Sequence, residues 1–417
     1  MTIEMLHSPQ DHPMNLRSQV LRSAIAAVFC VGMMFGQTAN GAAPRNRGIG
    51  YTRTIPYQGS IEEALSAAPA TTIPMATFTG AATKDGKSYT DTIVGASPFS
   101  PTKTTTTINV VLVPVIVQIG STTFSPTAND PCIVPKMTPL AAFQQSPLLQ
   151  NVVFDGGGGN GHAATINGVN VGTTTYPDAV RRAEFWSTVA GTAYHTAFKV
   201  TTVPAWTITA AEVAMLGGGK VLASACANLG VLPANSFQNY IQNTVIPGIP
   251  AITSTSFALF MMSNVVTTNS ASLNCFNGCV FGYHAAFGSP VQTYAVSEYD
   301  STQQFWSAPG IRNISILSHE IGEWMDNPLG LNLTPAWGKA GTVFGCAAVW
   351  EAGDPLTGMD FPAIEMTNGV SYDPQELAFY SWYYNSATTA SLGAQGKFSS
   401  NRTFARPSKA CPPGGTF

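Results

Sequence analysis

The segment from Ile314 to Pro328, ISILSHEIGEWMDNP, places three side chains that can bind metal or move protons within five positions. His319 and Glu323 are four residues apart, so on a helix both side chains leave the same face, one turn apart. Glu320 is next to His319 and could deprotonate a water molecule held by the same metal ion. The spacing therefore predicts a metal-binding helix with Glu320 as the general base.

This pattern is the H-E-x-x-H helix of zinc metallopeptidases with one change, because Glu323 replaces the second histidine. Zn²⁺ accepts carboxylate oxygens, but an added carboxylate weakens the ability of the metal to acidify water. The alternative is an exposed acidic helix face. Metal binding is favoured because the chain has only 22 acidic residues, and two of them, Glu320 and Glu323, lie within five positions together with His319. We expect a short, partly buried helix that Asn327 and Pro328 end.

A third ligand must come from another segment. Glu351 and Asp354 in the sequence WEAGDP are the first and second candidates, and Gly353 between them permits a tight turn. His284 is the third candidate, although a histidine at the end of an apolar stretch is more often a hydrogen-bonded core residue. His195 has the same status.

The elements that must position these residues are helices and strands in irregular order. Apolar periodicity predicts strands at 108–119, 254–266 and 291–296, and helices at 60–67, 177–192, 209–215 and 236–245. Pro114 predicts an irregularity in the first strand. Thr209 and Glu212 have the spacing of a capping box. No βαβ rhythm and no internal repeat is present, so we expect an α+β fold with a mixed sheet.

Composition narrows the classes of function. The chain has 417 residues, 45% of them hydrophobic, which is enough for a large core. A net charge of -3 and the lack of a basic cluster argue against a nucleic-acid partner. Charged residues are only 10% of the chain, and Gly, Pro, Ser and Thr are abundant. This composition is typical of an exported protein.

The N-terminus predicts export directly. Arg17 and Arg22 precede an apolar run of about a dozen residues, and Ala39 and Gly41 are small residues at the positions that a signal peptidase reads. We expect a signal peptide at 1–41 and a secreted protein, extracellular or periplasmic. The run is too short for a membrane span of roughly 20 residues, so no stable membrane insertion is expected. An extended N-terminal segment at 42–105 would precede the main domain at 106–417.

Six cysteines follow the predicted cleavage site: Cys132, Cys226, Cys275, Cys279, Cys346 and Cys411. An even number in an oxidising compartment predicts up to three disulfides among 15 possible pairings. A zinc cluster of these thiols is the alternative, but only Cys275 and Cys279 are close in sequence.

The motif SHEIGEWMDNP, followed by EAGD and by DPQELAFYSW at 373–382, resembles a group of secreted bacterial zincin-like metallopeptidases. Their pattern is H-E-x-x-E, a Thr-Asp-Pro or Thr-Asn-Pro, and then E-x-x-D; Asp326 stands here where the pattern has Thr. YPDAVRRAEFW at 176–186, Tyr194-His195, GYH at 282–284 and YAV at 294–296 extend the similarity over roughly residues 106–385. The chain is also distantly similar to plant phosphate-induced, exordium-like proteins, which keep the Asn-Pro but lack the H-E-x-x-E residues.

The resemblance implies a zincin-like domain at 106–417 and a zinc endopeptidase acting on protein or peptide substrates. His319 and Glu323, with Glu351 or Asp354, would hold Zn²⁺, and Glu320 would act on the metal-activated water. Tyr283, His284 and Tyr372 are candidates for oxyanion stabilisation. The alternative is a non-catalytic extracellular or wall-associated protein with Ca²⁺ bound by oxygens alone, or with no metal. The seven Trp support it if they are exposed, because aromatic rings stack on sugars.

Overall fold

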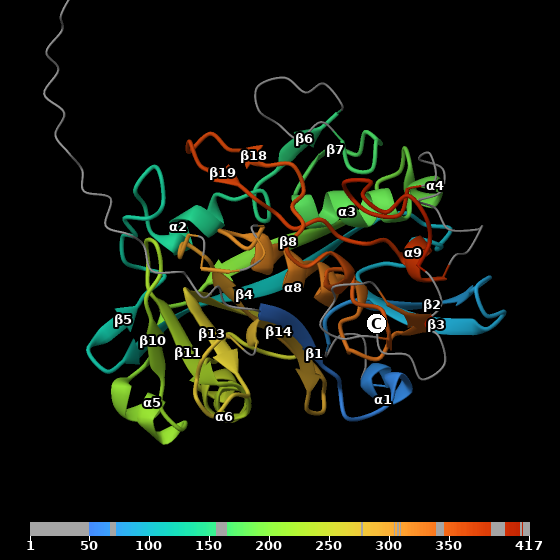
Figure 1. Cartoon of the computed structure of the whole chain (residues 1–417). Coiled ribbons are helices and arrows are strands. Elements are labelled where there is room, and N and C mark those ends of the chain that lie inside the picture. Colours follow the sequence, from blue (N-terminus) through green and yellow to red (C-terminus); the bar gives the residue numbers. More distant parts are fainter. Residues whose placement is uncertain are drawn as a thin grey trace, which may run out of the picture. The chain divides into compact units, whose positions relative to one another are not determined.

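The computed structural model describes residues 50–66, 72–155, 165–276, 278–303, 305–306, 308, 310–338, 346–384, 397–408 and 411. The predicted signal peptide at 1–41 lies outside the described residues, and so do residues 156–164 after Asp155. Residues 46–417 belong to one compact unit. The fold of its described part is mixed α+β, and Figure 1 shows the arrangement of its elements.

The main sheet is mixed. Its strands are β1 (Gly50–Ile55), β4 (Thr105–Ile119), β5 (Thr122–Phe124), β8 (His195–Thr202), β9 (Trp206–Ile208), β10 (Lys220–Leu222), β11 (Leu229–Pro233), β12 (Ser256–Ser263), β13 (Val265–Thr268), β14 (Cys279–Phe287) and β15 (Gln292–Tyr299). The order is β10-β11-β13-β14-β15-β12-β4-β5, while β1 pairs with β14, and β8 and β9 pair with β4. The β12 pairs with β4 and β15 are parallel, and the β14–β15 pair is antiparallel.

Short strand pairs and helices surround this sheet. The pairs are β2 (Met75–Ala81) with β3 (Ser88–Val94), β6 (Val152–Phe154) with β7 (Gly172–Thr174), β16 (Leu333–Trp337) with β17 (Ala347–Val349), and β18 (Ile364–Glu365) with β19 (Ser371–Tyr372). The helices are α1 (Ile61–Leu65), α2 (Pro139–Gln144), α3 (Tyr176–Glu184), α4 (Trp186–Val189), α5 (Ala210–Met215), α6 (Ala234–Tyr240), α7 (Ile246–Gly248), α8 (Ser315–Asp326) and α9 (Tyr380–Tyr384), with a π-helical turn η2 (Ile241–Val245) and a 3₁₀ turn η3 (Asp354–Leu356).

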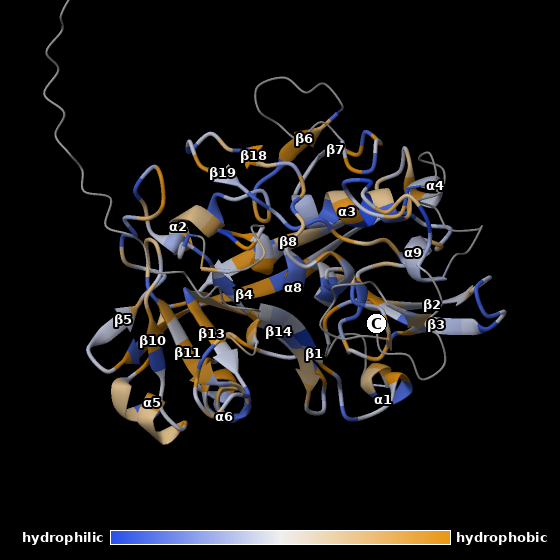
Figure 2. Ribbon diagram, in the orientation of Figure 1, coloured by the Kyte–Doolittle hydropathy of each residue, from blue (hydrophilic) through white to orange (hydrophobic). Residues whose placement is uncertain are grey.

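Strand β4 shows why the sheet is covered on both faces. Ile108, Val110 and Leu112 belong to the apolar core that includes α3 and α8, while Val111 and Val113 belong to the core that includes α5, α6 and α7. Successive side chains of a strand point to opposite faces, so an uninterrupted apolar run must be buried on both. In Figure 2, α8 carries hydrophobic and hydrophilic residues together.

Most of the expected elements are present, with local differences. The capping box of Thr209 and Glu212 begins α5. The partner of β4 changes from β8 to β9 around Pro114, which has no N–H to donate. The helix expected at 177–192 breaks at Phe185 into α3 and α4. The single strand expected at 254–266 is two strands, because the backbone of Asn264 turns to a φ of 54°.

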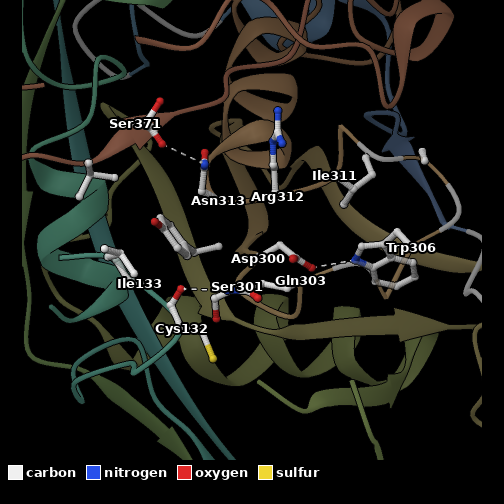
Figure 3. Close-up of a pocket in the computed structure, with 14 residues that line it drawn as sticks. Cys132, Ile133, Asp300, Ser301, Gln303, Trp306, Ile311, Arg312, Asn313 and Ser371 are labelled. Atoms are coloured by element: carbon white, nitrogen blue, oxygen red, sulfur yellow. Dashed lines mark hydrogen bonds between the residues drawn. The ribbon is translucent and has the colours of Figure 1, made fainter. Parts of the chain in front are cut away.

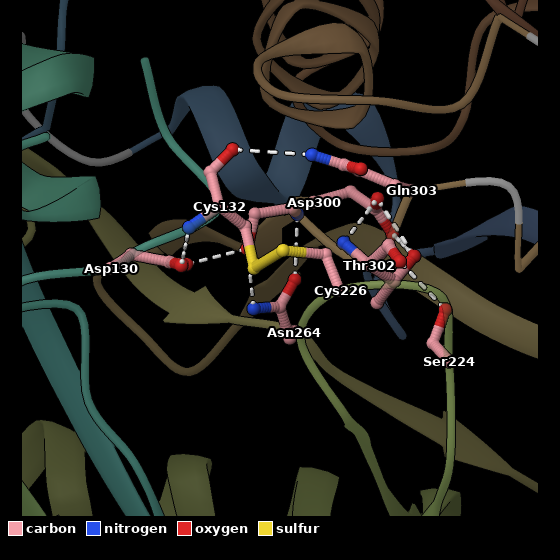
Figure 4. Close-up of a disulfide and its surroundings, with 9 residues drawn as sticks. Asp130, Cys132, Ser224, Cys226, Asn264, Asp300, Thr302 and Gln303 are labelled. Atoms are coloured by element: carbon pink, nitrogen blue, oxygen red, sulfur yellow. Dashed lines mark hydrogen bonds between the residues drawn. A yellow bond between two sulfur atoms is a disulfide. The ribbon is translucent and has the colours of Figure 1, made fainter. Parts of the chain in front are cut away.

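The six cysteines form three disulfides, Cys132–Cys226, Cys275–Cys279 and Cys346–Cys411. This confirms the prediction of up to three bridges, and Cys275 and Cys279 bond to each other instead of holding zinc. Figure 4 shows the first bridge beside Asp130, whose carboxylate accepts a hydrogen bond of 2.8 Å from the backbone N–H of Cys132. Cys132–Cys226 and Cys346–Cys411 join segments 94 and 65 positions apart, whereas Cys275–Cys279 is local.

The segment expected to lead into the main domain contributes to the sheet. Its strand β1 pairs in parallel with β14, with Thr54 opposite His284 and Ile55 opposite Ala285. Its strand β3 contacts α8. Within the described part of the chain, no helix combines the length and the apolar character needed to cross a lipid bilayer.

Candidate metal centre

Helix α8 carries the predicted ligands in the interior of the protein. It lies against β14 and β15, and Trp324 stacks on Phe257 at 3.6 Å between ring centroids. The helix ends at Asp326, as Asn327 and Pro328 predicted. The expectation of a partly buried helix was wrong, since every residue of α8 is buried. Strand β3 contacts the helix, and the Leu377 side chain lies where a Cβ on Gly322 would be.

His319 and Glu323 converge as their spacing predicted. The His319 Nε2 atom lies 2.9 Å from Glu323 Oε1 and 3.7 Å from Asp354 Oδ1. The backbone N–H groups of Gly353 and Asp354 both donate to Glu323 Oε1 at 3.1 Å, so the turn η3 fixes this carboxylate against α8. Asp354 thus joins the two helix residues in one group of potential ligands.

The orientation of the His319 ring is set by Gln375. The Gln375 side-chain amide donates to the Gly353 carbonyl at 2.8 Å, so its oxygen faces His319 Nδ1 at 3.0 Å and accepts the proton there. In the neutral ring the other nitrogen, Nε2, then has a free lone pair aimed at Glu323 and Asp354. Metal-bound histidines are held in this way by a second hydrogen bond.

His284 of β14 joins the cluster from the sheet. Its Nε2 donates to the Asn327 carbonyl at 3.1 Å. Its Nδ1 lies 3.6 Å from Glu320 Oε2 and 3.7 Å from Glu323 Oε2 and has no hydrogen-bond partner among the described residues. His284 is therefore more than a hydrogen-bonded core histidine, because its Nδ1 atom faces two carboxylates of the predicted motif.

Glu351 closes the cluster. One of its oxygens, Oε1, accepts a 2.9 Å hydrogen bond from the Asn327 side chain, and the other, Oε2, lies 3.8 Å from His284 Nε2. Asn327 therefore contacts both Glu351 and His284. The sequence pattern identified Asn327 as a helix stop only, and its bridging role depends on contacts across the fold.

Two glycines leave room for the cluster. A Cβ atom on Gly353 would lie 2.4 Å from His319 Nδ1, and one on Gly282 would lie 2.7 Å from Glu320 Oε1. The φ of Gly353 is -89°, an ordinary value. The expected tight turn does follow Gly353, since η3 begins at Asp354. With this φ, however, a glycine is needed at position 353 for the close approach of the His319 ring and not for the turn.

The electrostatics of the protein groups favour a cation. Burial, followed by the charges of Glu323 and Asp354, raises the pKa of Glu320 well above its usual value. Burial raises the pKa of Asp354 to about 8 and lowers that of His284 to about 4. Burial alone would lower the pKa of His319, but Glu323 and Asp354 raise it. Crowded buried carboxylates beside two imidazole rings are a donor set suited to a divalent ion.

The remaining candidates lie outside this cluster. His195 Nδ1 is 2.6 Å from the Asp178 carboxylate. Tyr283 belongs to the core on the opposite face of the sheet from α8, and the Tyr372 hydroxyl donates to the Ala142 carbonyl at 2.6 Å. Neither tyrosine is therefore placed to stabilise an oxyanion at the cluster.

A cavity of about 660 Å³ lies at the N-terminal end of α8. Figure 3 shows two hydrogen bonds on its walls, from the Trp306 indole N–H to the Asp300 carboxylate and from the Asn313 side-chain amide to the Ser371 carbonyl. None of the cluster residues lines this cavity. The cluster itself is closed, since its most exposed member, Asp354, is only 9% exposed.

Comparison with known proteins gives no relative: no family model, no curated protein and no solved structure matches the chain. The case for a function therefore depends on the geometry of the cluster.

Proposed function

We propose that this protein is a secreted metal-dependent hydrolase of zincin-like fold, and that it acts as a zinc endopeptidase on protein or peptide substrates. The observation that carries the proposal is the buried cluster in which Gln375 directs His319 Nε2 toward Glu323 and Asp354. The signal peptide predicted at 1–41 and the three disulfides support a site of action outside the cytoplasm.

The donor set supports zinc over calcium. His319, Glu323 and Asp354 would hold the ion, with Glu351 as a further carboxylate in reach of the cluster. Imidazole nitrogen is a ligand of zinc and other transition metals, whereas Ca²⁺ takes oxygen ligands. When bound, the ion would polarise the scissile carbonyl and acidify water.

Glu320 would hold the proton of the attacking water. Both of its carboxylate oxygens are buried and have no hydrogen-bond partner among the described residues. A buried carboxylate whose pKa is raised by burial is a stronger base than an exposed one. It lies beside Gly282, which leaves space for its oxygens.

A substrate carbonyl would reach the cluster only after a covering segment moves. Strand β1 is the best candidate for this segment, because the Thr52 hydroxyl donates to Asp354 Oδ1 at 2.8 Å and β1 pairs with the strand that carries His284. Side chains alternate along a strand, so Thr52 and Thr54 share the face toward the cluster. This arrangement supports β1 as the segment that would open the site.

The complete burial of the cluster also favours a second candidate, a non-catalytic extracellular protein with a structural metal ion. A structural site is closed, whereas a catalytic site keeps an open position. The aromatic argument for sugar binding has lost its support, since five Trp are buried and Trp186 and Trp206 are half-buried.

The test is proteolysis of an unfolded protein substrate by the purified protein, with zinc and with a chelator. The proposal expects cleavage that chelation and Glu320→Gln abolish, while His195→Gln leaves it unchanged. Cleavage that survives chelation would refute it, and stoichiometric zinc without any cleavage would favour the structural candidate.

A further inference from the structure

The potential ligands of the cluster fall into two groups. Among the described residues, the atoms of His284, Glu320 and Glu323 lie within 4.8 Å of one another, and so do those of His319, Glu323 and Asp354. Neither group contains both histidines, and Glu323 is the residue that they share. We propose that the cluster holds two divalent metal ions bridged by the Glu323 carboxylate. This inference rests on the proposed metal site and adds a second ion to it.

The distances are close to those between two ligands of one metal ion. Two ligands with metal bonds of about 2.1 Å are about 3.0 to 3.6 Å apart for bond angles of 90° to 120°. In the group around His319, the distances from Nε2 are 2.9 Å and 3.7 Å, one just below and one just above this range. In the group around His284, the distances from Nδ1 are 3.6 Å and 3.7 Å, too long for direct hydrogen bonds.

The Glu323 carboxylate is oriented as a bridge. Its Oε1 atom faces His319 and its Oε2 atom faces His284. Two backbone N–H groups of the η3 segment hold Oε1, so the side chain has little freedom to turn both oxygens toward one histidine. Each oxygen is therefore available to a different ion.

The two imidazole nitrogens that face the cluster are prepared for metal in the same way. Each histidine uses its other nitrogen for a hydrogen bond, His319 with Gln375 and His284 with the Asn327 carbonyl. The inward nitrogens, His319 Nε2 and His284 Nδ1, have no hydrogen-bond partner among the described residues, and both side chains are 0% exposed. An unpartnered buried nitrogen beside carboxylates is costly unless a cation lies between them.

Charge balance is consistent with two divalent ions. Glu320, Glu323, Glu351 and Asp354 place four carboxylates in this buried volume, with a formal charge of about -4 when all are ionised. Beside one divalent ion, two of these carboxyl groups would have to stay protonated, or be ionised in the interior at a cost of several kcal/mol each. The nearby Asp326 needs no metal ion to balance its charge, because Arg181 Nη2 pairs with its carboxylate at 2.7 Å. Two divalent ions neutralise the four carboxylates.

The proposal changes the role of Glu320. If the cluster holds a single ion at His319, Glu320 is a general base, and removing its carboxylate leaves the metal content unchanged. If a second ion is present, Glu320 is one of its ligands together with His284, and removing the Glu320 carboxylate lowers the metal content by one ion. Metal content thus distinguishes the two roles without measuring activity.

The experiment measures zinc bound per chain by mass spectrometry of the native full-length protein after dialysis. We expect two zinc ions for the wild type, one each for His284→Gln and Glu320→Gln, and fewer than one for Glu323→Gln. His195→Gln is the matched control and should retain two. Because a buried variant can fail to fold, the wild type is also loaded with Mn²⁺, and its electron paramagnetic resonance spectrum should show two coupled ions.

The outcomes separate this inference from the proposed function. A single bound ion in the wild type, with an uncoupled Mn²⁺ spectrum, overturns the second site and leaves a mononuclear hydrolase intact. Two coupled ions in a protein that cleaves no substrate support the two-ion centre and overturn the peptidase. No bound ion overturns both.

Discussion

Gln375→Leu should weaken metal binding because it removes the group that orients His319. The side chain accepts the His319 Nδ1 proton at 3.0 Å and donates to the Gly353 carbonyl at 2.8 Å. Leucine has a similar size and can do neither. The His319 ring would then be free to rotate, and Nε2 would no longer be held toward Glu323 and Asp354.

The magnitude follows from the two lost hydrogen bonds. Loss of a partner that orients a metal-bound histidine typically costs 10- to 100-fold in metal affinity, or about 1.4 to 2.7 kcal/mol. Two buried polar groups also lose their partner, at about 1 to 3 kcal/mol each, so the free energy of unfolding should fall by about 2 to 6 kcal/mol. Gln375→Leu should therefore be less stable as well as weaker in metal binding.

The assay is a zinc titration against a chromophoric chelator, together with thermal unfolding in zinc and in chelator. Because zinc binds the folded state, the difference between the two melting temperatures should be smaller for Gln375→Leu than for the wild type. Gln242→Leu is the matched control, since Gln242 donates to the Tyr294 hydroxyl at 3.0 Å, away from the cluster. Wild-type zinc affinity in folded Gln375→Leu would refute the reasoning.

Three further predictions concern the surroundings of the cluster. Gly353→Ala would place a Cβ 2.4 Å from His319 Nδ1, so it should lower stability by about 1 to 3 kcal/mol and reduce bound zinc. Burial raises the pKa of Asp91 to about 7, so the stability that its protonated form contributes is present below about pH 4 and is lost as the pH rises through 7. Asp91→Asn should remove this loss of up to about 4 kcal/mol from the pH dependence of urea unfolding. A disulfide from Ile55→Cys with Ala285→Cys should lock β1 onto β14 and block proteolysis until it is reduced.

Each of these has a clear contrary result. Full zinc content in Gly353→Ala would show that the His319 ring has room that the structure does not indicate. An unchanged pH profile in Asp91→Asn would mean that this carboxyl is already ionised in the folded protein. For the β1 lock, Thr79→Cys with Thr90→Cys joins the paired strands β2 and β3 as a control, and equal activity in both oxidised variants would exclude movement of β1.

Local patterns anticipated the parts of the site that lie close together in sequence. The placement of His319 and Glu323 on one face follows from the helical period and needs no tertiary information. The capping box at Thr209 and the apolar run of β4 are similarly local. The break at Phe185 and the turn at Asn264 were missed, because the apolar pattern continues across both positions.

Contacts between distant segments decided the rest. The sequence named Glu351 and Asp354 as candidates, but only the packing of η3 against α8 brings Asp354 to His319. Gln375 lies in the motif of the C-terminal segment, yet its bond to His319 spans 56 positions and no spacing rule predicts it.

The sequence by itself determined a helix with a ligand pair on one face, an even set of cysteines after a short apolar leader, and a chain with an apolar core. The tertiary structure alone decided that His284 joins the pair, that β1 lies over the cluster, and which cysteines bond. The physical reason is the range of the interactions. Helical period and capping act over a few residues, whereas strand pairing and core packing join residues whose separation along the chain carries no signal.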